Sequence, residues 1–126
     1  MPSAGPVTRA LSRFGPPLAL MGLIFFLSAQ PDLNSGLGTL DTILRKLAHM
    51  TEYALLWLLW LRAFGFRRPA LAAAIAIAYA ITDELHQSGV EGRVGSPRDV
   101  LIDAAGVAIA WALWARRERR SAHRPA

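Results

Sequence analysis

Cysteine is absent from this chain of 126 residues, and lysine occurs once, at Lys46. The lack of cysteine excludes a disulfide framework and any thiol chemistry. No internal repeat is present, which argues against a repeat architecture. No single motif has the specificity of a zinc-protease signature such as HExxH. Function therefore has to be inferred from how scattered polar residues are distributed among apolar blocks.

Acidic residues are few, so the net charge is +5 and the isoelectric point is about 11.0. A basic chain raises the possibility of nucleic-acid binding. The arginines do not alternate with exposed aromatic residues and form no stripe on an amphipathic helix; they flank the apolar blocks. This pattern is typical of membrane topology signals and argues against a nucleic-acid partner.

The apolar residues make up 53% of the chain and fall in blocks that have no polar stripe. Helices that are apolar on every face require a large core or a membrane, and this chain is too short to surround several of them. We therefore predict an all-α polytopic membrane protein, a bundle of four transmembrane helices in one domain covering residues 1–126. The expected spans are about 12–29, 43–64, 69–86 and 99–115, followed by a basic tail, 116–126.

The first apolar block also has features of a signal peptide, with a basic lead and a short apolar core. The small-residue pattern at Ser28-Ala29-Gln30 is a poor cleavage site, so we favour an uncleaved first span. The dominance of arginine over lysine, with many alanines, indicates a GC-rich bacterial genome. The expected location is the bacterial cytoplasmic membrane.

The orientation follows from the distribution of lysine and arginine. Ten of the 14 basic residues lie in the N-terminal lead, the turn at 62–68 and the C-terminal tail, and four lie in the other loops. The positive-inside rule then places both termini in the cytoplasm. The charged residues at the opposite ends of the spans would face outward, toward the periplasm or the cell wall.

Those outward ends carry histidines and carboxylates at helical spacing. Lys46, His49 and Tyr53 share one face of the second span, with Glu52 one turn from His49. Asp83, His86 and Gln87 share a face of the third span, and Glu84 points about 100° away from Asp83. Asp99 and Asp103 share a face of the fourth, followed by Gly106, which permits close approach of a neighbouring helix. Ionisable groups are costly inside a membrane, so their convergence predicts a functional site.

The candidate residues form two groups. The candidate catalytic residues are His49, Glu52, Asp83 and His86. The candidate ligand-binding residues are Lys46, Tyr53, Glu84, Gln87, Arg93, Arg98, Asp99 and Asp103. His49 is the candidate base, with Glu52 and Asp83 as its orienting groups or metal partners, and Arg93 is the candidate anion contact.

Three kinds of chemistry fit this set. The imidazoles and carboxylates are ligand types for a divalent metal ion such as zinc, manganese or iron. A histidine beside a carboxylate is also a common proton acceptor. Arg93, Arg98 and Lys46, with the start of the fourth helix, could bind a phosphate or carboxylate group. The alternative is a structural network in which the acids and histidines only pair with nearby cations.

The aromatic residues suggest simpler roles. Trp57 and Trp60 are expected at a membrane interface or facing lipid, and Trp111 and Trp114 are expected as interfacial anchors. Tyr53 and Tyr79 are expected to be packing residues whose hydroxyl groups find a hydrogen-bond partner.

Two segments, RKLAHMTEYALLWLL and AYAITDELHQSGVEGRVGSPRDVLIDAAG, resemble the VanZ-like membrane protein family. Together they cover about a third of the chain. The matching positions are Lys46, His49, Glu52, Tyr53, Asp83, Glu84, His86, Gln87, Arg93, Asp99, Asp103 and Gly106. Two positions depart from the family pattern: Met50 replaces a frequent aromatic residue, and Asp103 replaces a frequent asparagine, which adds a carboxylate.

The resemblance implies a role in the bacterial cell envelope. The founding member of the family is an accessory glycopeptide-resistance protein that lowers sensitivity to teicoplanin. By analogy, the expected partners are the lipid bilayer and a lipid- or peptidoglycan-related ligand that the site binds or modifies. A non-enzymatic membrane scaffold, in which the polar network is structural, is the competing hypothesis; family analogy does not supply a mechanism.

Overall fold

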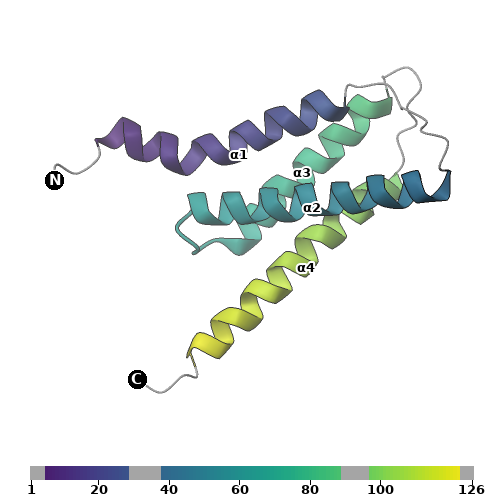
Figure 1. Cartoon of the computed structure of the whole chain (residues 1–126). Coiled ribbons are helices and arrows are strands. Elements are labelled where there is room, and N and C mark those ends of the chain that lie inside the picture. The colour runs from purple at the N-terminus through teal and green to yellow at the C-terminus, as the bar shows by residue number, and fades with distance from the viewer. Residues whose placement is uncertain (1–4, 29–37, 89–96, 123–126) are drawn as a thin grey trace.

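The computed structural model describes residues 5–28, 38–88 and 97–122, and within these ranges it consists of four helices and no strand. They are α1 (Pro6–Ser28), α2 (Thr39–Ala63), α3 (Pro69–Ser88) and α4 (Pro97–Ala122). Successive helices run back and forth, so that the start of α1, the α2–α3 turn and the end of α4 lie toward one side (Figure 1). The prediction of an all-α fold with four helices is confirmed.

The turn between α2 and α3 is built by glycine. Gly65 has a φ of 69° and Phe66 a φ of 62°, and the Phe66 N–H donates to the Leu61 carbonyl at 2.8 Å. The Gly65 N–H donates to the Arg62 carbonyl at 3.0 Å. These two bonds form a Schellman motif, which ends α2 and reverses the chain. Pro69 then occupies the first position of α3, where its missing N–H costs nothing.

Helix α2 is the centre of the bundle, because it makes the most extensive contacts, against α4, α3 and α1. Tyr53, Leu56, Trp57 and Leu61 on this helix are fully buried. The facing side of α3 is made of small residues, and four of them are buried: Ala72, Ala73, Ala76 and Ala80. Small side chains let the helix backbones approach closely.

The tryptophans correct a prediction made from the sequence. Trp57 is completely buried, and its indole N–H donates to the Pro69 carbonyl at 3.1 Å. Its ring stacks on Trp111, with ring centres 6.2 Å apart, and meets Trp114 edge-on at 6.1 Å. The expectation of an interfacial or lipid-facing Trp57 is therefore wrong, because α2 turns this ring toward α4. Trp111 and Trp114 pack on it and are half-buried.

Helix α1 lies at the edge of the bundle and packs on α2 and α3. It begins at Pro6, about two turns before the boundary predicted from hydropathy, and its two internal prolines, Pro16 and Pro17, do not end it. Ile24 is buried, whereas Leu18, Leu23 and Phe26 are more than half exposed. Within the described ranges, α1 is the one helix that is long and apolar enough to cross a membrane, judged by length and composition.

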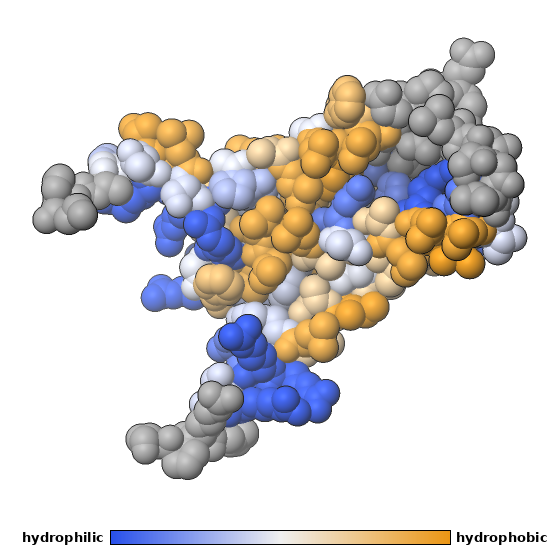
Figure 2. Space-filling view, viewed as in Figure 1, coloured by the Kyte–Doolittle hydropathy of each residue, from blue (hydrophilic) through white to orange (hydrophobic). Residues whose placement is uncertain are grey.

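Exposed apolar side chains continue over the other helices, as the orange surface in Figure 2 shows. Leu85 and Leu101 are each 70% exposed, and Leu113 is 62% exposed. Carboxylates, histidines and basic residues interrupt the apolar stretches of α2, α3 and α4. The residues that would form a polar site are therefore among those that lower the hydropathy of these helices.

Helix α4 extends well beyond the span predicted at 99–115. It runs to Ala122, so most of the predicted basic tail is helical, and Arg116, Arg117 and Arg120 are exposed along it. The blue patch on this segment lies on the same side of the molecule as the start of α1 (Figure 2).

Candidate functional site

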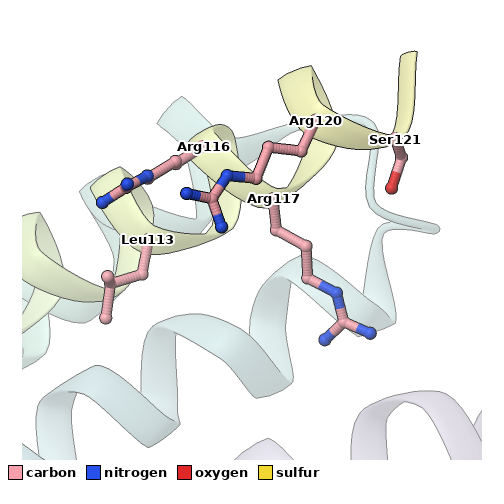
Figure 3. Close-up of a pocket in the computed structure, with 5 residues that line it drawn as sticks. All are labelled: Leu113, Arg116, Arg117, Arg120 and Ser121. Carbon is pink, nitrogen blue, oxygen red and sulfur yellow. The ribbon is translucent and has the colours of Figure 1, made fainter. Parts of the chain in front are cut away.

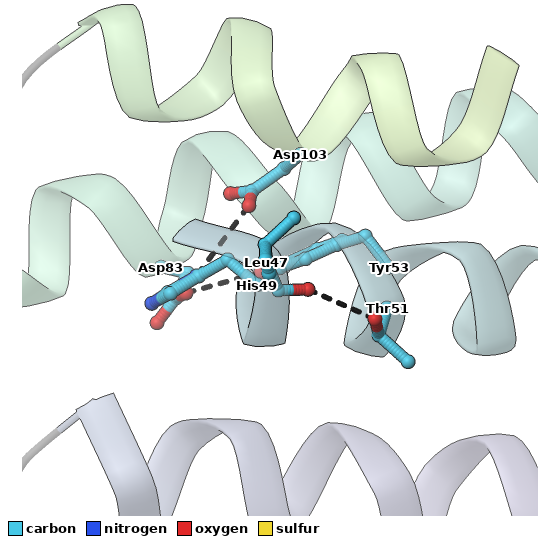
Figure 4. Close-up of polar contacts among 6 residues, drawn as sticks. All are labelled: Leu47, His49, Thr51, Tyr53, Asp83 and Asp103. Carbon is cyan, nitrogen blue, oxygen red and sulfur yellow. Dashed lines mark hydrogen bonds and ion pairs between the residues drawn. The ribbon is translucent and has the colours of Figure 1, made fainter. Parts of the chain in front are cut away.

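Three polar side chains from three helices meet inside the bundle. His49 lies on α2, Asp83 on α3 and Asp103 on α4 (Figure 4). Asp83 and Asp103 are each only 3% exposed, and His49 is half-buried. One nitrogen of the imidazole and one oxygen of each carboxylate all lie within 4.8 Å of one another. We call these three residues the polar trio.

The position of the trio follows from the hairpin order of the helices. Asp83 lies five residues before the end of α3, and Asp103 lies six residues after the start of α4. At 1.5 Å per residue, each carboxylate is roughly 8–9 Å from its helix end. The trio therefore lies inside the bundle, toward the end opposite the α2–α3 turn (Figure 1).

The trio depends on close contact between α2 and α4. A Cβ built on Gly106 would lie 2.3 Å from the Met50 carbonyl oxygen, so only glycine fits there. Met50 follows His49 in the chain, and Gly106 is one helical turn after Asp103. The backbone contact therefore brings the imidazole and the carboxylate together, and the predicted role of Gly106 in close approach is confirmed.

Two interactions connect the trio to its surroundings. His49 Nδ1 lies 3.4 Å from Asp103 Oδ1, an ion-pair distance. The buried hydroxyl of Tyr53, one turn along α2, donates to Asp83 Oδ2 at 3.1 Å. Tyr53 thus fixes the orientation of the Asp83 carboxylate, and its predicted role as a packing residue with a hydrogen-bonded hydroxyl is confirmed. Figure 4 also shows Thr51, whose hydroxyl donates to the Leu47 carbonyl at 2.8 Å and takes no part in the trio.

Each residue of the trio has one buried atom without a hydrogen-bond partner. The three atoms are His49 Nδ1, Asp83 Oδ1 and Asp103 Oδ1. Buried polar atoms are hydrogen-bonded in the great majority of cases, so three unpaired atoms in one place require an explanation. The arrangement can hold a cation, accept a proton or bind a polar ligand.

His86 and Glu52 were predicted beside His49 and Asp83, and the structure places neither in the trio. The His86 ring stacks on Phe25 of α1, with centroids 4.1 Å apart, and its Nδ1 is buried without a hydrogen-bond partner. Glu52 is half-buried one turn from His49. His86 therefore belongs to the contact between α1 and α3.

The remaining candidates lie around or beyond the trio. Lys46, Glu84 and Asp99 are half-buried, and Arg98 is exposed at the start of α4. Asp99 shares a helix face with Asp103 but is not one of the three converging ligands. Arg93 and the side chain of Gln87 fall outside the described residues.

A separate pocket lies far along α4, at its basic end. Leu113, Arg116, Arg117, Arg120 and Ser121 line a cavity of about 470 Å³ (Figure 3). Its three guanidinium groups are exposed to solvent, and the trio contributes no side chain to it. This pocket is a cationic surface, whereas the trio is a buried group of acids and an imidazole.

The VanZ/LLP1 family model matches residues 14–117, which include all of α2 and α3, most of α1 and α4, and every residue of the trio. The chain belongs to the VanZ/LLP1 family. No curated protein and no solved structure matches it. The resemblance found in the two polar segments is confirmed, and the VanZ assignment covers most of the chain.

Within this VanZ-family chain, two features of the site were not evident from sequence reasoning. Asp103 was one of several ligand-binding candidates, but the structure makes it an equal member of the trio. The Phe25–His86 stack was not predicted either, because no sequence pattern links α1 to α3. The signal for Asp103 was present in its spacing from Gly106, since a close helix contact also brings nearby side chains together.

Proposed function

We propose that this VanZ-family protein is a multi-pass protein of the bacterial cytoplasmic membrane, with four spans and both termini in the cytoplasm. The trio then lies toward the outer surface and binds a lipid- or peptidoglycan-related ligand. The expected role is in the cell envelope, including glycopeptide resistance of the teicoplanin type. Whether the ligand is also modified depends on the chemistry of the trio.

The observation that carries this proposal is a buried polar trio in a bundle whose exterior is largely apolar. Burying two carboxylates costs several kcal/mol unless they are well paired, so a purely structural core gains little from them. Basic side chains cluster at the other end of the bundle, on the α2–α3 turn and along the end of α4. That asymmetry supports the proposed orientation through the positive-inside rule.

The orientation can be tested with single cysteines, because the natural chain has none. Thr42→Cys places a thiol near the start of α2, and Arg67→Cys places one in the basic turn; both sites are exposed. In intact spheroplasts, a membrane-impermeant maleimide should label the cysteine at 42 and leave the cysteine at 67 unlabelled until the membrane is permeabilised. The reverse pattern, or equal labelling of both, would refute the proposed topology.

The role of the trio can be tested in cells that lack the chromosomal copy of the gene. His49→Gln and Asp83→Asn should abolish the effect of the protein on teicoplanin susceptibility or on an envelope-stress reporter. Glu118→Gln is the matched control, because it neutralises an exposed carboxylate on the basic end of α4. If both trio variants are present at normal abundance and retain full activity, the proposed site is wrong.

The competing function is a membrane scaffold whose polar network only fixes helix packing. It is favoured by the Tyr53–Asp83 hydrogen bond and the His49–Asp103 ion pair, both of which connect different helices. Under this hypothesis the trio variants lose thermal stability in detergent in proportion to their loss of cellular activity. Under the site hypothesis they lose activity without a loss of thermal stability when a chelator is present.

A further inference from the structure

We propose that His49, Asp83 and Asp103 together bind one divalent transition-metal ion of the zinc and manganese class. The inference rests on the trio alone. It holds or fails independently of the envelope role proposed above, because it concerns what the three side chains coordinate and not what the protein does with it.

The three donor atoms are close enough to bind one ion. They lie within 4.8 Å of one another and come from three different helices. A tetrahedral zinc ion with bonds of about 2.0–2.2 Å holds neighbouring donors about 3.5 Å apart. His49 Nδ1 and Asp103 Oδ1 are 3.4 Å apart, and no pair of donors is farther apart than 4.8 Å, so small side-chain rotations would bring all three to this spacing. An ion would fill the space that the three side chains surround.

Each side chain of the trio has a buried polar atom that lacks a hydrogen-bond partner. These atoms are His49 Nδ1, Asp83 Oδ1 and Asp103 Oδ1. Both carboxylates are 97% buried, as their 3% exposure shows. His49 Nδ1 and Asp103 Oδ1 are 3.4 Å apart yet form no hydrogen bond. A cation between these atoms would satisfy all three at once.

The trio carries an excess of negative charge that a cation would compensate. Within residues 5–28, 38–88 and 97–122, the two buried carboxylates have as their hydrogen-bond and ion-pair partners only the Tyr53 hydroxyl and His49. Two ionised carboxylates and a protonated imidazole would still carry a net charge of −1. Buried charge of one sign is strongly unfavourable unless it is compensated. A divalent cation bound by the two carboxylates and a neutral imidazole gives a neutral group.

Neighbouring residues hold the donor side chains in position. Tyr53 holds the second oxygen of Asp83 at 3.1 Å, which leaves the buried Oδ1 without a hydrogen-bond partner. The contact between Gly106 and the Met50 backbone fixes α4 against α2 beside the other two donors. Metal ligands in proteins are commonly oriented by such second interactions, which prevent the donors from turning away.

The donor types select the class of ion. One imidazole nitrogen with two carboxylate oxygens suits zinc, manganese and iron, whereas a site for calcium would require six or more oxygen donors. Three protein ligands leave at least one coordination position for water or for a ligand, as in catalytic metal sites. The ion would therefore be both a structural link among α2, α3 and α4 and a Lewis acid for a bound phosphate or carboxylate.

The test uses the full-length protein purified in detergent, stripped with a chelator and titrated with Zn²⁺ or Mn²⁺ alone. The wild type should bind about one equivalent of at least one of these ions and melt at a higher temperature when the ion is present. His49→Gln and Asp103→Asn should each weaken binding at least 100-fold. Tyr53→Phe keeps all three donors and should weaken binding about 10-fold, as expected for loss of a second interaction.

Two variants serve as matched controls. His86→Gln removes the imidazole that stacks on Phe25, and Asp99→Asn neutralises a carboxylate one turn before Asp103; both should bind the ion with wild-type affinity. If His49→Gln and Asp103→Asn do not fold, two measurements remain as the test. They are the rise in the melting temperature of the wild type on addition of the ion, and the affinity of Tyr53→Phe for the ion.

The proposal is overturned if the stripped wild type binds neither ion stoichiometrically. It is also overturned if His86→Gln or Asp99→Asn weakens binding as much as the trio variants do. In that case the ion would be held by other residues.

Discussion

The same two helices, α2 and α4, meet in two layers with opposite chemistry. In the polar layer His49 faces Asp103, and in the aromatic layer Trp57 stacks on Trp111. Each aromatic residue follows its polar counterpart by eight residues on its own helix. The layers are therefore about 12 Å apart along helices that run side by side in the same direction (Figure 1).

In the aromatic layer the buried ring is fully packed and its N–H is hydrogen-bonded, whereas the polar layer contains buried atoms without partners. Trp57 is fully buried, its N–H has a carbonyl partner, and two other indoles cover its ring. The polar layer leaves three buried donor and acceptor atoms unpaired. One end of the interface thus maximises packing, and the other leaves buried polar atoms unpaired at a cost in stability. Functional sites commonly show this kind of local conflict.

The largest expected effect is in the aromatic layer. Trp57→Ala removes the most voluminous of the fully buried side chains and should lower the free energy of unfolding by about 4 kcal/mol, mainly through lost packing and the cavity left behind. Leu58→Ala, at the neighbouring half-exposed position, should cost less than about 1 kcal/mol. Thermal melts in the same detergent measure both. Equal losses would show that the aromatic layer does not stabilise the bundle more than its surface does.

Gly106→Ala should have the next largest effect and should damage both layers. The added Cβ meets the Met50 carbonyl oxygen, so α2 and α4 must separate, and we expect a loss of about 3 kcal/mol. Gly22→Ala is the control, because a Cβ there meets nothing within 4 Å; it should stabilise α1 by about 0.5 kcal/mol. A melting temperature unchanged by Gly106→Ala would contradict the close contact of the two helices.

Asp83→Asn, in the polar layer, should change the stability of the protein in opposite directions with and without metal. In metal-stripped protein it removes one of two neighbouring buried carboxylates and retains an oxygen for the Tyr53 hydroxyl, so stability should rise by about 1 kcal/mol. With Zn²⁺ or Mn²⁺ present, the variant should be less stable than the wild type, because a ligand is lost. Melting curves with and without the ion measure the reversal. A loss of stability in both conditions would indicate a structural network.

Tyr53→Phe should have a small effect on stability, similar in size to that of Asp83→Asn in stripped protein. It removes the hydrogen bond to Asp83 while keeping the ring in place, and should cost about 1 kcal/mol in stripped protein. Tyr79→Phe removes a comparable bond to the Met21 carbonyl, which connects α3 to α1 outside the trio. Both variants should melt alike without metal, whereas only Tyr53→Phe should reduce the metal-dependent increase in melting temperature.

The order of the helices was available from the sequence. Apolar blocks, the glycine turn at Gly65 and the proline at Pro69 place the α2–α3 hairpin to within a few residues, because turn and helix-start signals are local. The ends of α1 and α4 were predicted less well. Hydropathy marks where apolar residues occur, whereas a helix continues through polar sequence as long as its backbone hydrogen bonds do.

The sequence predicted which residues could lie near one another in the candidate site, but not how their side chains are arranged. Spacings of three and four residues show which side chains share a face of one helix, and they correctly indicated that His49, Asp83 and Asp103 could converge. They do not fix how far each helix is rotated about its own axis. For that reason the sequence could not separate Asp103, which enters the trio, from Glu52 and His86, which do not.

The sequence by itself determined an all-helical chain of the VanZ/LLP1 family, with acids and histidines near one set of helix ends and arginines near the other. The tertiary structure decided which of these groups meet. Helix rotation and separation are set by side-chain packing between α2, α3 and α4, and above all by the backbone contact at Gly106. Contacts between residues more than 50 positions apart, such as that of His49 with Asp103, leave no local pattern to read.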